Sequence, residues 1–378
     1  MDPIYLDHNA TTSVDPQVLE AMLPYLREEF GNPSSVYALG RRAHAAVEQP
    51  RTEVAGLIGA RPEEIVFTGG ATEATNIAIR GAVALDSSRM GIVTTNIEHP
   101  ATDACCHLLE RAGHPVERVP ASRSGIVTSD RVAAMVGQGT AVVTVIHAQN
   151  EIGTIQPVSE IARAARTRGA LVHTDAAQSV GKIPVRVKEL GVDLLTIAGH
   201  KLYAPKGVGA LFVRKDVRLP PLLVGAGQEH GLRPGTENVA CIVGLGVACA
   251  VAGRTLEASR TRIAELSATF LELLRREVPG LVLVGDRERR LPNTLNVCFP
   301  AVSGRKLLDA CPQVLASTGS ACHADSEEPS AILNALGLSR TAALGAVRLS
   351  LGRSTTRAEV ERAACELTRA WRQVRGSH

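Results

Sequence analysis

The sequence predicts an α/β fold with a mostly parallel central sheet, accompanied by a smaller α+β domain. Two observations predict this fold. From about residue 60 to residue 215, short apolar runs alternate with segments whose apolar residues recur at helical spacing. From about residue 255 the alternation stops, and a long amphipathic segment leads into a strand region and a closing helical segment. Strand–helix alternation places a helix between successive strands and so makes them parallel.

The strands expected in the first part share apolar or β-branched residues followed by turn formers or polar residues. They lie at 64–70, 91–99, 140–150, 170–178, 193–201 and 209–215. Helices are expected between them. In one of these, 158–169, apolar residues recur at helical spacing and a glycine ends the pattern.

In the second part we expect a helix over 256–278, a strand over 291–300 and a helix over 356–374. The chain should therefore form a large domain over residues 15–250 and a small domain from residues 1–14 and 251–374. The segment 375–378 reads RGSH and resembles the remnant of an affinity tag.

The composition argues against several function classes. The chain has 378 residues, 45% of them hydrophobic and 21% charged, with a formal net charge of +3. This charge gives no support for direct nucleic-acid binding or for a membrane surface. No uninterrupted apolar run reaches the length of a membrane span, and the first residues lack the features of a signal peptide. The 8 cysteines form no C-x-x-C pair, so we expect a cytoplasmic protein without a metal site.

Polar residues follow the expected strands at the ends where open α/β sheets bind ligands. The segment FTGGATEATN (67–76) is a glycine-rich turn that opens into a helix, so the N–H groups of Ala71 and Thr72 should form an anion site. It lacks the lysine of a Walker loop, and its glycines do not match the dinucleotide fingerprint. The segment therefore predicts a phosphate group, but not that of ATP. The alternative is a helix that Thr72 merely caps.

Asp175 and Lys201 each end one of the expected strands. A buried carboxylate needs a cationic partner, and a protonated pyridine nitrogen would serve. Lys201 could form a Schiff base with an aldehyde. A phosphate, a pyridinium and an aldehyde together describe pyridoxal 5′-phosphate, whose electron sink makes removal of an amino acid's Cα proton feasible. His99 could then lie against the ring face and Gln178 near the ring oxygen. The alternatives are a solvated strand end for Lys201, a helix cap for Asp175 and a core residue for His99.

Blocks spread along the chain carry a family resemblance: YLDHNATT, GNPSS, TGGATEATN, EHPA, NEIGTIQP, HTDAAQSVGK, GHKLYAPKGVG, RPGTEN, STGSACH and VRLSLGRSTT. Together they resemble the cysteine desulfurases of the class V aminotransferase superfamily, in the group with a long mobile loop, and equally the selenocysteine lyases. The resemblance runs through nearly the whole chain. It implies a fold-type I transferase fold that depends on pyridoxal 5′-phosphate.

The activity that the resemblance implies is removal of sulfur from L-cysteine, giving L-alanine and a persulfide on Cys322 that passes to a protein sulfur acceptor. The alternative is a selenocysteine lyase, which releases selenide and L-alanine from L-selenocysteine. A class V aminotransferase has no use for a loop cysteine, so Cys322 argues against transamination. The acceptor stays open among iron–sulfur assembly, tRNA thiolation, DNA sulfur modification and selenium recycling.

The resemblance also implies a role for each site residue. Lys201 would carry the cofactor and shuttle the Cα proton, Asp175 would pair with the ring nitrogen, and His99 would stack on the ring and assist proton transfer. The other contacts fall on the ring oxygen (Gln178), the phosphate (Ala71, Thr72, His200) and the substrate carboxylate (Asn150, Arg348), with Asn150 also touching the cofactor.

Thr236, in RPGTEN, would reach the phosphate from the neighbouring subunit, which makes a homodimer a requirement of the site. The alternative for Thr236 is a plain loop cap. Cys322 lies among small and polar residues (315–331), which predicts a mobile surface loop rather than a core thiol. Ala198 stands where most desulfurases have a serine whose hydroxyl contacts the phosphate, so one donor should be missing.

Overall fold

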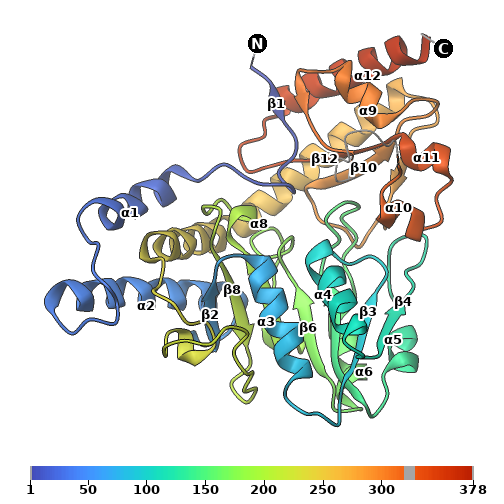
Figure 1. Ribbon diagram of the computed structural model, residues 1–378. Coiled ribbons are helices and arrows are strands. Elements are labelled where there is room, and N and C mark those ends of the chain that lie inside the picture. Colours follow the sequence, from blue (N-terminus) through green and yellow to red (C-terminus); the bar gives the residue numbers. More distant parts are fainter. Residues whose placement is uncertain (1, 319–327, 377–378) are drawn as a thin grey trace.

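A computed structural model describes residues 2–318 and 328–376. Its centre is a seven-stranded sheet with the strand order β2-β8-β7-β6-β5-β3-β4 (Figure 1). The pairs from β7 through β6, β5 and β3 to β4 are parallel, and β8 is antiparallel to both of its neighbours, so the predicted mostly parallel sheet is confirmed. The strands are β2 (Ile65–Thr68), β3 (Gly91–Thr95), β4 (Val116–Val119), β5 (Thr140–Ile146), β6 (Leu171–Asp175), β7 (Leu194–Ala198) and β8 (Gly209–Val213).

Helices cover both faces of this sheet. Helices α3 (Ala71–Val83) and α4 (Pro100–Arg111) share one apolar cluster with it. A second cluster lies on the other face and includes side chains of α1 (Pro16–Arg27), α2 (Ala38–Ile58), α5 (Ser129–Met135), α6 (Val158–Arg166) and α7 (Val187–Leu190). Because both faces are covered, the central strands are apolar nearly throughout, and every residue of β5 is buried.

The small domain is built on a three-stranded antiparallel sheet of β9 (Val282–Val284), β10 (Thr294–Cys298) and β12 (Ala346–Ser350). The N-terminal β1 (Ile4–Tyr5) joins this domain by pairing in parallel with β11 (Val314–Leu315). The remaining helices of this part are α9 (Gly304–Asp309), α10 (Ala331–Ala335), α11 (Arg340–Leu344) and α12 (Arg357–Gly376). Short 3₁₀ turns η1 (Pro62–Glu64), η2 (Gly199–Lys201) and η3 (Glu229–Gly231) belong to the large domain.

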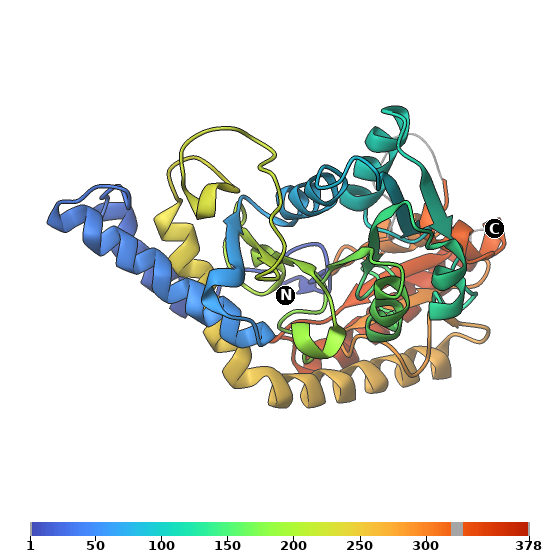
Figure 2. The ribbon, with the colours of Figure 1, turned by 90° about the horizontal axis from the view of Figure 1, so that it is seen from below.

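Helix α8 (Val239–Glu277) differs from the expectation. It begins at Val239 rather than 256, so the boundary predicted between residues 250 and 251 falls inside one continuous helix. Figure 2 shows this helix running along the molecule from the large domain to the small one. Its first half packs into the core of the large domain and its second half into that of the small domain. The first half of this helix was not predicted, because a stretch of small and apolar residues has no polar face and so shows no helical periodicity.

The first half of α8 is also long and apolar enough to suit a membrane span by length and composition alone. A buried core helix passes the same test, and 56% of that stretch is buried inside the protein. The contacts of α8 with α1 and α2 account for its apolar residues within this fold.

A buried ion pair ties α2 to the edge of the large sheet. Arg51 on α2 and Glu229 on η3 form two hydrogen bonds of 2.8 Å, and their side chains are 5% and 3% exposed. The same carboxylate accepts the N–H of Phe67 at 2.6 Å, and Arg51 donates to the carbonyl of Ile65 at 2.9 Å. The pair therefore holds the edge strand β2, which leads directly into the turn before α3.

We predict that Glu229→Ala lowers the free energy of unfolding by about 3–5 kcal/mol, because it removes the buried partner of Arg51 and the acceptor of the Phe67 N–H, and leaves the guanidinium only the half-exposed Glu48. Glu29→Ala is the control, since it breaks the more exposed pair with Arg42 and should cost less than about 1 kcal/mol. Urea unfolding followed by circular dichroism at one protein concentration measures both. Equal losses in the two variants would contradict the role given to the buried pair.

Candidate active site

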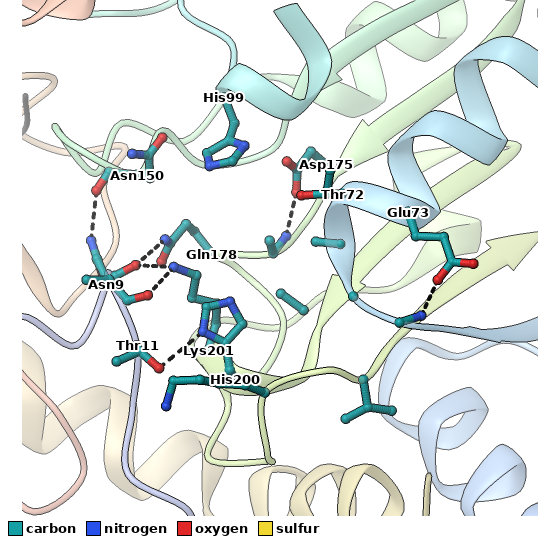
Figure 3. A pocket seen from close by; sticks show the side chains of 18 of the residues that line it. Asn9, Thr11, Thr72, Glu73, His99, Asn150, Asp175, Gln178, His200 and Lys201 are labelled. Atoms are coloured by element: carbon teal, nitrogen blue, oxygen red, sulfur yellow. Dashed lines mark hydrogen bonds between the residues drawn. The ribbon is translucent and has the colours of Figure 1, made fainter. Parts of the chain in front are cut away.

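One cavity of about 960 Å³ opens at the carboxyl ends of the parallel strands. Most of the residues singled out in the sequence line it, and they come from separate elements: the start of α3, the residue before α4, and the ends of β5, β6 and β7 (Figure 3). These lining residues are Ala71, Thr72, His99, Asn150, Asp175, Gln178, Ala198, His200, Lys201 and Arg348. Arg348 is the one contributed by the small domain, from β12.

Among the described residues, one expected site residue, Thr236, does not line the cavity of its own chain. Thr236 is exposed and lies in the segment between η3 and α8. Arg233, close to it in sequence, forms an ion pair with Glu73 on the first turn of α3, with 3.0 Å between nitrogen and oxygen. Cys322 lies outside the described residues. None of the described cysteines lines the cavity, and burial raises the pKa of Cys106 to about 12.

The glycine-rich turn brings backbone N–H groups to the cavity. Gly70 precedes α3 with a φ of 146°, a conformation that side chains other than glycine's rarely adopt. A Cβ at Gly209 on β8 would lie 2.9 Å from the backbone of Gly70, so glycine is required there for close approach. The first N–H groups of α3 have no partner within the helix and suit an anion, as the sequence predicted.

Lys201 reaches the cavity from η2, directly after β7. Its ammonium nitrogen donates to the carbonyl oxygens of Asn9 and Ala10, at 2.6 Å in both cases. Burial, and next the charge of Arg348, lower the pKa of Lys201 to about 8. A considerable fraction of the amine is therefore neutral near neutral pH, which is the form that can attack an aldehyde or accept a proton.

Asp175 and His99 face each other across the cavity (Figure 3). Asp175 is buried at the end of β6 and accepts the N–H of Ala177 at 2.9 Å. Burial raises its pKa, and the charge of His99 opposes the shift. His99 precedes α4, and its Nδ1 accepts the N–H of Ala101 at 3.1 Å, so the proton of the neutral ring belongs to Nε2. Burial lowers the pKa of His99 and favours this neutral form.

Arg348 is already engaged by the protein. It forms an ion pair of 2.7 Å with Asp7 and donates to the carbonyl of Asn150 at 3.3 Å. Its Nε is buried and has no hydrogen-bond partner among the described residues. A substrate carboxylate would therefore compete with Asp7 for the guanidinium.

The N-terminal segment supplies residues that sequence reasoning assigned no role. Asn9, Ala10 and Thr11 all line the cavity, and Thr11 shares a hydrogen bond of 3.1 Å with Nδ1 of His200. Burial lowers the pKa of His200 to about 4, so this ring is neutral and can donate or accept. The one sequence signal for these three residues is that they belong to the block YLDHNATT. They follow no predicted strand of the sheet, so the strand pattern could not place them at the site.

The residues present fit pyridoxal 5′-phosphate. The N-terminus of α3, the Thr72 hydroxyl and His200 can hold a phosphate. Asp175 has no lysine or arginine within ion-pair distance among the described residues, so a protonated ring nitrogen would supply the cation that it lacks. Lys201 offers a partly neutral amine to the aldehyde in the same cavity.

Comparison with known proteins finds similar proteins that match nearly the whole chain. The model of the aminotransferase class-V family matches residues 4–363. A curated cysteine desulfurase of Trichormus azollae is 44% identical over 364 residues, which are 96% of this chain and 91% of that protein.

Two solved structures are similar in fold and sequence. A NifS-like protein superposes with a TM-score of 0.91 at 35% identity, covering 97% of this chain and 98% of the other. The structure described as SspA in complex with cysteine has a TM-score of 0.82 at 35% identity, covering 93% of this chain and 99% of the other.

Glu98 lies next to His99 in sequence but points into the protein interior. One carboxyl oxygen accepts the Thr95 hydroxyl at 2.6 Å and the N–H of Ile146 at 3.0 Å. The other is buried with no partner among the described residues. Burial is the main reason that the pKa of Glu98 is raised to about 8, so the group is protonated near neutral pH.

We predict that Glu98→Gln stabilises the protein relative to wild type increasingly as the pH rises from 5 to 8. In the folded state the wild-type group keeps its proton up to about pH 8, whereas in the unfolded state it loses it near 4.5, so unfolding releases a proton in this window and stability falls with rising pH. Glutamine cannot titrate and escapes this loss.

Thermal unfolding of both proteins across this pH range is the measurement, with Glu20→Gln on the exposed side of α1 as the control. A difference between wild type and Glu98→Gln that stays constant with pH would show that Glu98 is ionised in the folded protein.

Proposed function

The chain belongs to the aminotransferase class-V family and to the cysteine desulfurases within it, and from this premise we propose how its residues take sulfur from L-cysteine. The observation that carries the proposal is the convergence of Lys201, Asp175, His99 and Arg348 on one cavity. The products are L-alanine and a persulfide, and the cofactor is pyridoxal 5′-phosphate.

Pyridoxal 5′-phosphate supplies the electron sink that makes loss of the substrate's Cα proton feasible. Lys201 anchors it and moves that proton, for which its lowered pKa suits it. Asp175 would stabilise a proton on the ring nitrogen, and the neutral His99 ring, whose Nε2–H is available for proton transfer, would pack beside the cofactor. Arg348 and Asn150 orient the substrate by its carboxylate, with the guanidinium exchanging Asp7 for the substrate.

The phosphate is held by the N–H groups of Ala71 and Thr72, the Thr72 hydroxyl and His200. We propose that Thr236 of a second subunit completes this set, so that the enzyme is a homodimer. Thr236 is exposed and lies outside its own cavity, which supports this arrangement. Large apolar side chains exposed on the large domain also support it, among them Phe30 at 77%, Val36 at 85% and Val224 at 92%.

Cys322 is the proposed sulfur carrier, since no described cysteine lines the cavity. Its thiolate attacks the sulfur of the bound substrate, the Cβ–S bond breaks, and the remaining carbon skeleton is protonated and released as L-alanine. The persulfide sulfur then passes to a thiol of an acceptor protein. Iron–sulfur assembly is the first pathway in which to test for that acceptor.

We predict that Lys201→Ala abolishes the absorbance of the covalently bound cofactor and lowers turnover of L-cysteine by at least about 10²–10⁴-fold, the range for loss of a general acid–base group. The protein should stay folded, as judged by circular dichroism. Lys206→Ala is the matched control, because Lys206 lines the same cavity and is exposed. If the absorbance survives in Lys201→Ala and disappears in Lys206→Ala, the anchor has been assigned to the wrong lysine.

We predict that Cys322→Ser keeps the cofactor absorbance but loses formation of the protein persulfide from L-cysteine. Mass spectrometry of the protein after a single turnover measures the persulfide. Cys365→Ser serves as the control, since Cys365 is exposed on α12. Normal alanine and persulfide production by Cys322→Ser would mean that Cys322 is not the carrier.

The same variant separates the two substrates. A selenolate leaves more readily than a thiolate, so survival of L-selenocysteine cleavage together with loss of L-cysteine cleavage in Cys322→Ser would favour a selenocysteine lyase. Loss of both activities would favour the desulfurase.

A further inference from the structure

Lys182 lies directly behind the site, and neither the sequence pattern nor the reaction described above gives it a role. It follows β6 and donates to Oδ1 of Asn9 at 2.8 Å and to Oε1 of Gln178 at 2.6 Å. Lys182 lines a separate small cavity of about 30 Å³, together with Lys201 and His8, and not the large cavity. Burial and the charges of Lys201 and Arg348 lower its pKa well below the usual value of a lysine.

The amide of Gln178 is held at both ends, its nitrogen by the carbonyl of Asn9 and its oxygen by Lys182. The amide nitrogen of Gln178 donates to the carbonyl of Asn9 at 2.9 Å, and a carbonyl oxygen can only accept. The amide oxygen must therefore face the other way, where Lys182 donates to it (Figure 3 shows the contacts of Gln178 with Asn9). In this orientation the second N–H of Gln178 has no acceptor among the described residues, and Gln178 lines the large cavity.

The same lysine fixes the amide of Asn9, which is 1% exposed. The side-chain nitrogen of Asn9 donates to the carbonyl of Asn150 at 3.0 Å and to the Thr294 hydroxyl at 2.8 Å. Its side-chain oxygen therefore faces Lys182 and also accepts from Asn293 at 3.0 Å. Asn9 thus joins the small domain to the site through an amide whose two ends cannot be exchanged.

We propose that Lys182 is a positioning residue for the cofactor: by donating to both amide oxygens, it acts together with the backbone carbonyl of Asn9 to make Gln178 present an N–H group, rather than an oxygen, to the ring oxygen of pyridoxal 5′-phosphate. Without the lysine only the carbonyl of Asn9 favours this orientation, and the oxygen of Gln178 loses its donor. The amide then turns over more readily, and a turned amide would place its oxygen against the ring oxygen. Lys182 is not a second anchor for the aldehyde, because its nitrogen is occupied by two acceptors and does not reach the large cavity. The inference rests on the function proposed above.

The test measures cofactor binding by the apoprotein rather than activity alone. Wild type, Lys182→Met, Gln178→Ala and the double variant are titrated with pyridoxal 5′-phosphate, and the pH midpoint of the absorbance change of the bound cofactor is recorded for each. Methionine keeps the length of lysine but cannot donate. Lys188→Met on α7 is the control, since Lys188 is exposed.

If Lys182 acts through Gln178, each single variant weakens cofactor binding by about tenfold and shifts the pH midpoint in the same direction. The double variant then binds the cofactor no more weakly than the single variant with the lower affinity. Lys182→Gln, whose amide can still donate one hydrogen bond, should lie between wild type and Lys182→Met. It also serves as the test variant if the methionine variant does not fold, which thermal unfolding will show.

Wild-type affinity and pH midpoint in a folded Lys182→Met or Lys182→Gln protein would overturn the inference. So would additive losses in the double variant, which would mean that Lys182 acts independently of Gln178. Failure of the wild-type apoprotein itself to bind the cofactor would overturn the proposed function instead, so the two failures are distinguishable.

Discussion

The site depends on a buried carboxylate that has no lysine or arginine within ion-pair distance among the residues that the structure describes. Asp175 ends a strand that is covered on both faces, and burial raises its pKa. A buried carboxylate destabilises the folded protein unless a cation pairs with it. A protonated ring nitrogen is the cation that the cavity can hold. The other lining groups then follow from the shape of one ligand. The N-terminus of α3 would meet its phosphate, Lys201 its aldehyde and Gln178 its ring oxygen.

Positive charge gathered in the same region tunes the reactive amine. Burial, and next the charges of Lys201 and Arg348, lower the pKa of Lys182. Burial, and next the charge of Arg348, lower the pKa of Lys201 to about 8. An amine with this pKa can give and take protons near neutral pH. Asp7 partly offsets the charge of Arg348, and a substrate carboxylate bound by Arg348 would have to displace it.

Local patterns in the sequence were sufficient for six of the seven strands of the large sheet and for most of the residues that line the cavity. The edge strand β4 was not predicted, because it is only partly buried and is not an apolar run. Each predicted strand of the large domain is present, because buried strands are apolar runs and end in polar residues at the edge where ligands bind. Lys201, Asp175, His99 and the start of α3 were found for the same reason. The first half of α8 was missed, because a helix buried on several sides carries no polar face, and so the domain boundary was placed inside it.

The sequence by itself determined the fold class, the family and the residues that end the parallel strands, since these features are written in short contiguous segments. Only the tertiary structure decided that Asn9 bridges the two domains, that Arg348 is held by Asp7, and that Lys182 orients the amide of Gln178. These contacts join residues far apart in the chain: Asn9 lies 169 positions from Gln178 and 285 from Thr294. Hydrogen-bond geometry between such residues is set by the packing of whole helices and strands. It therefore cannot be predicted from the periodicity or the motifs of a short segment.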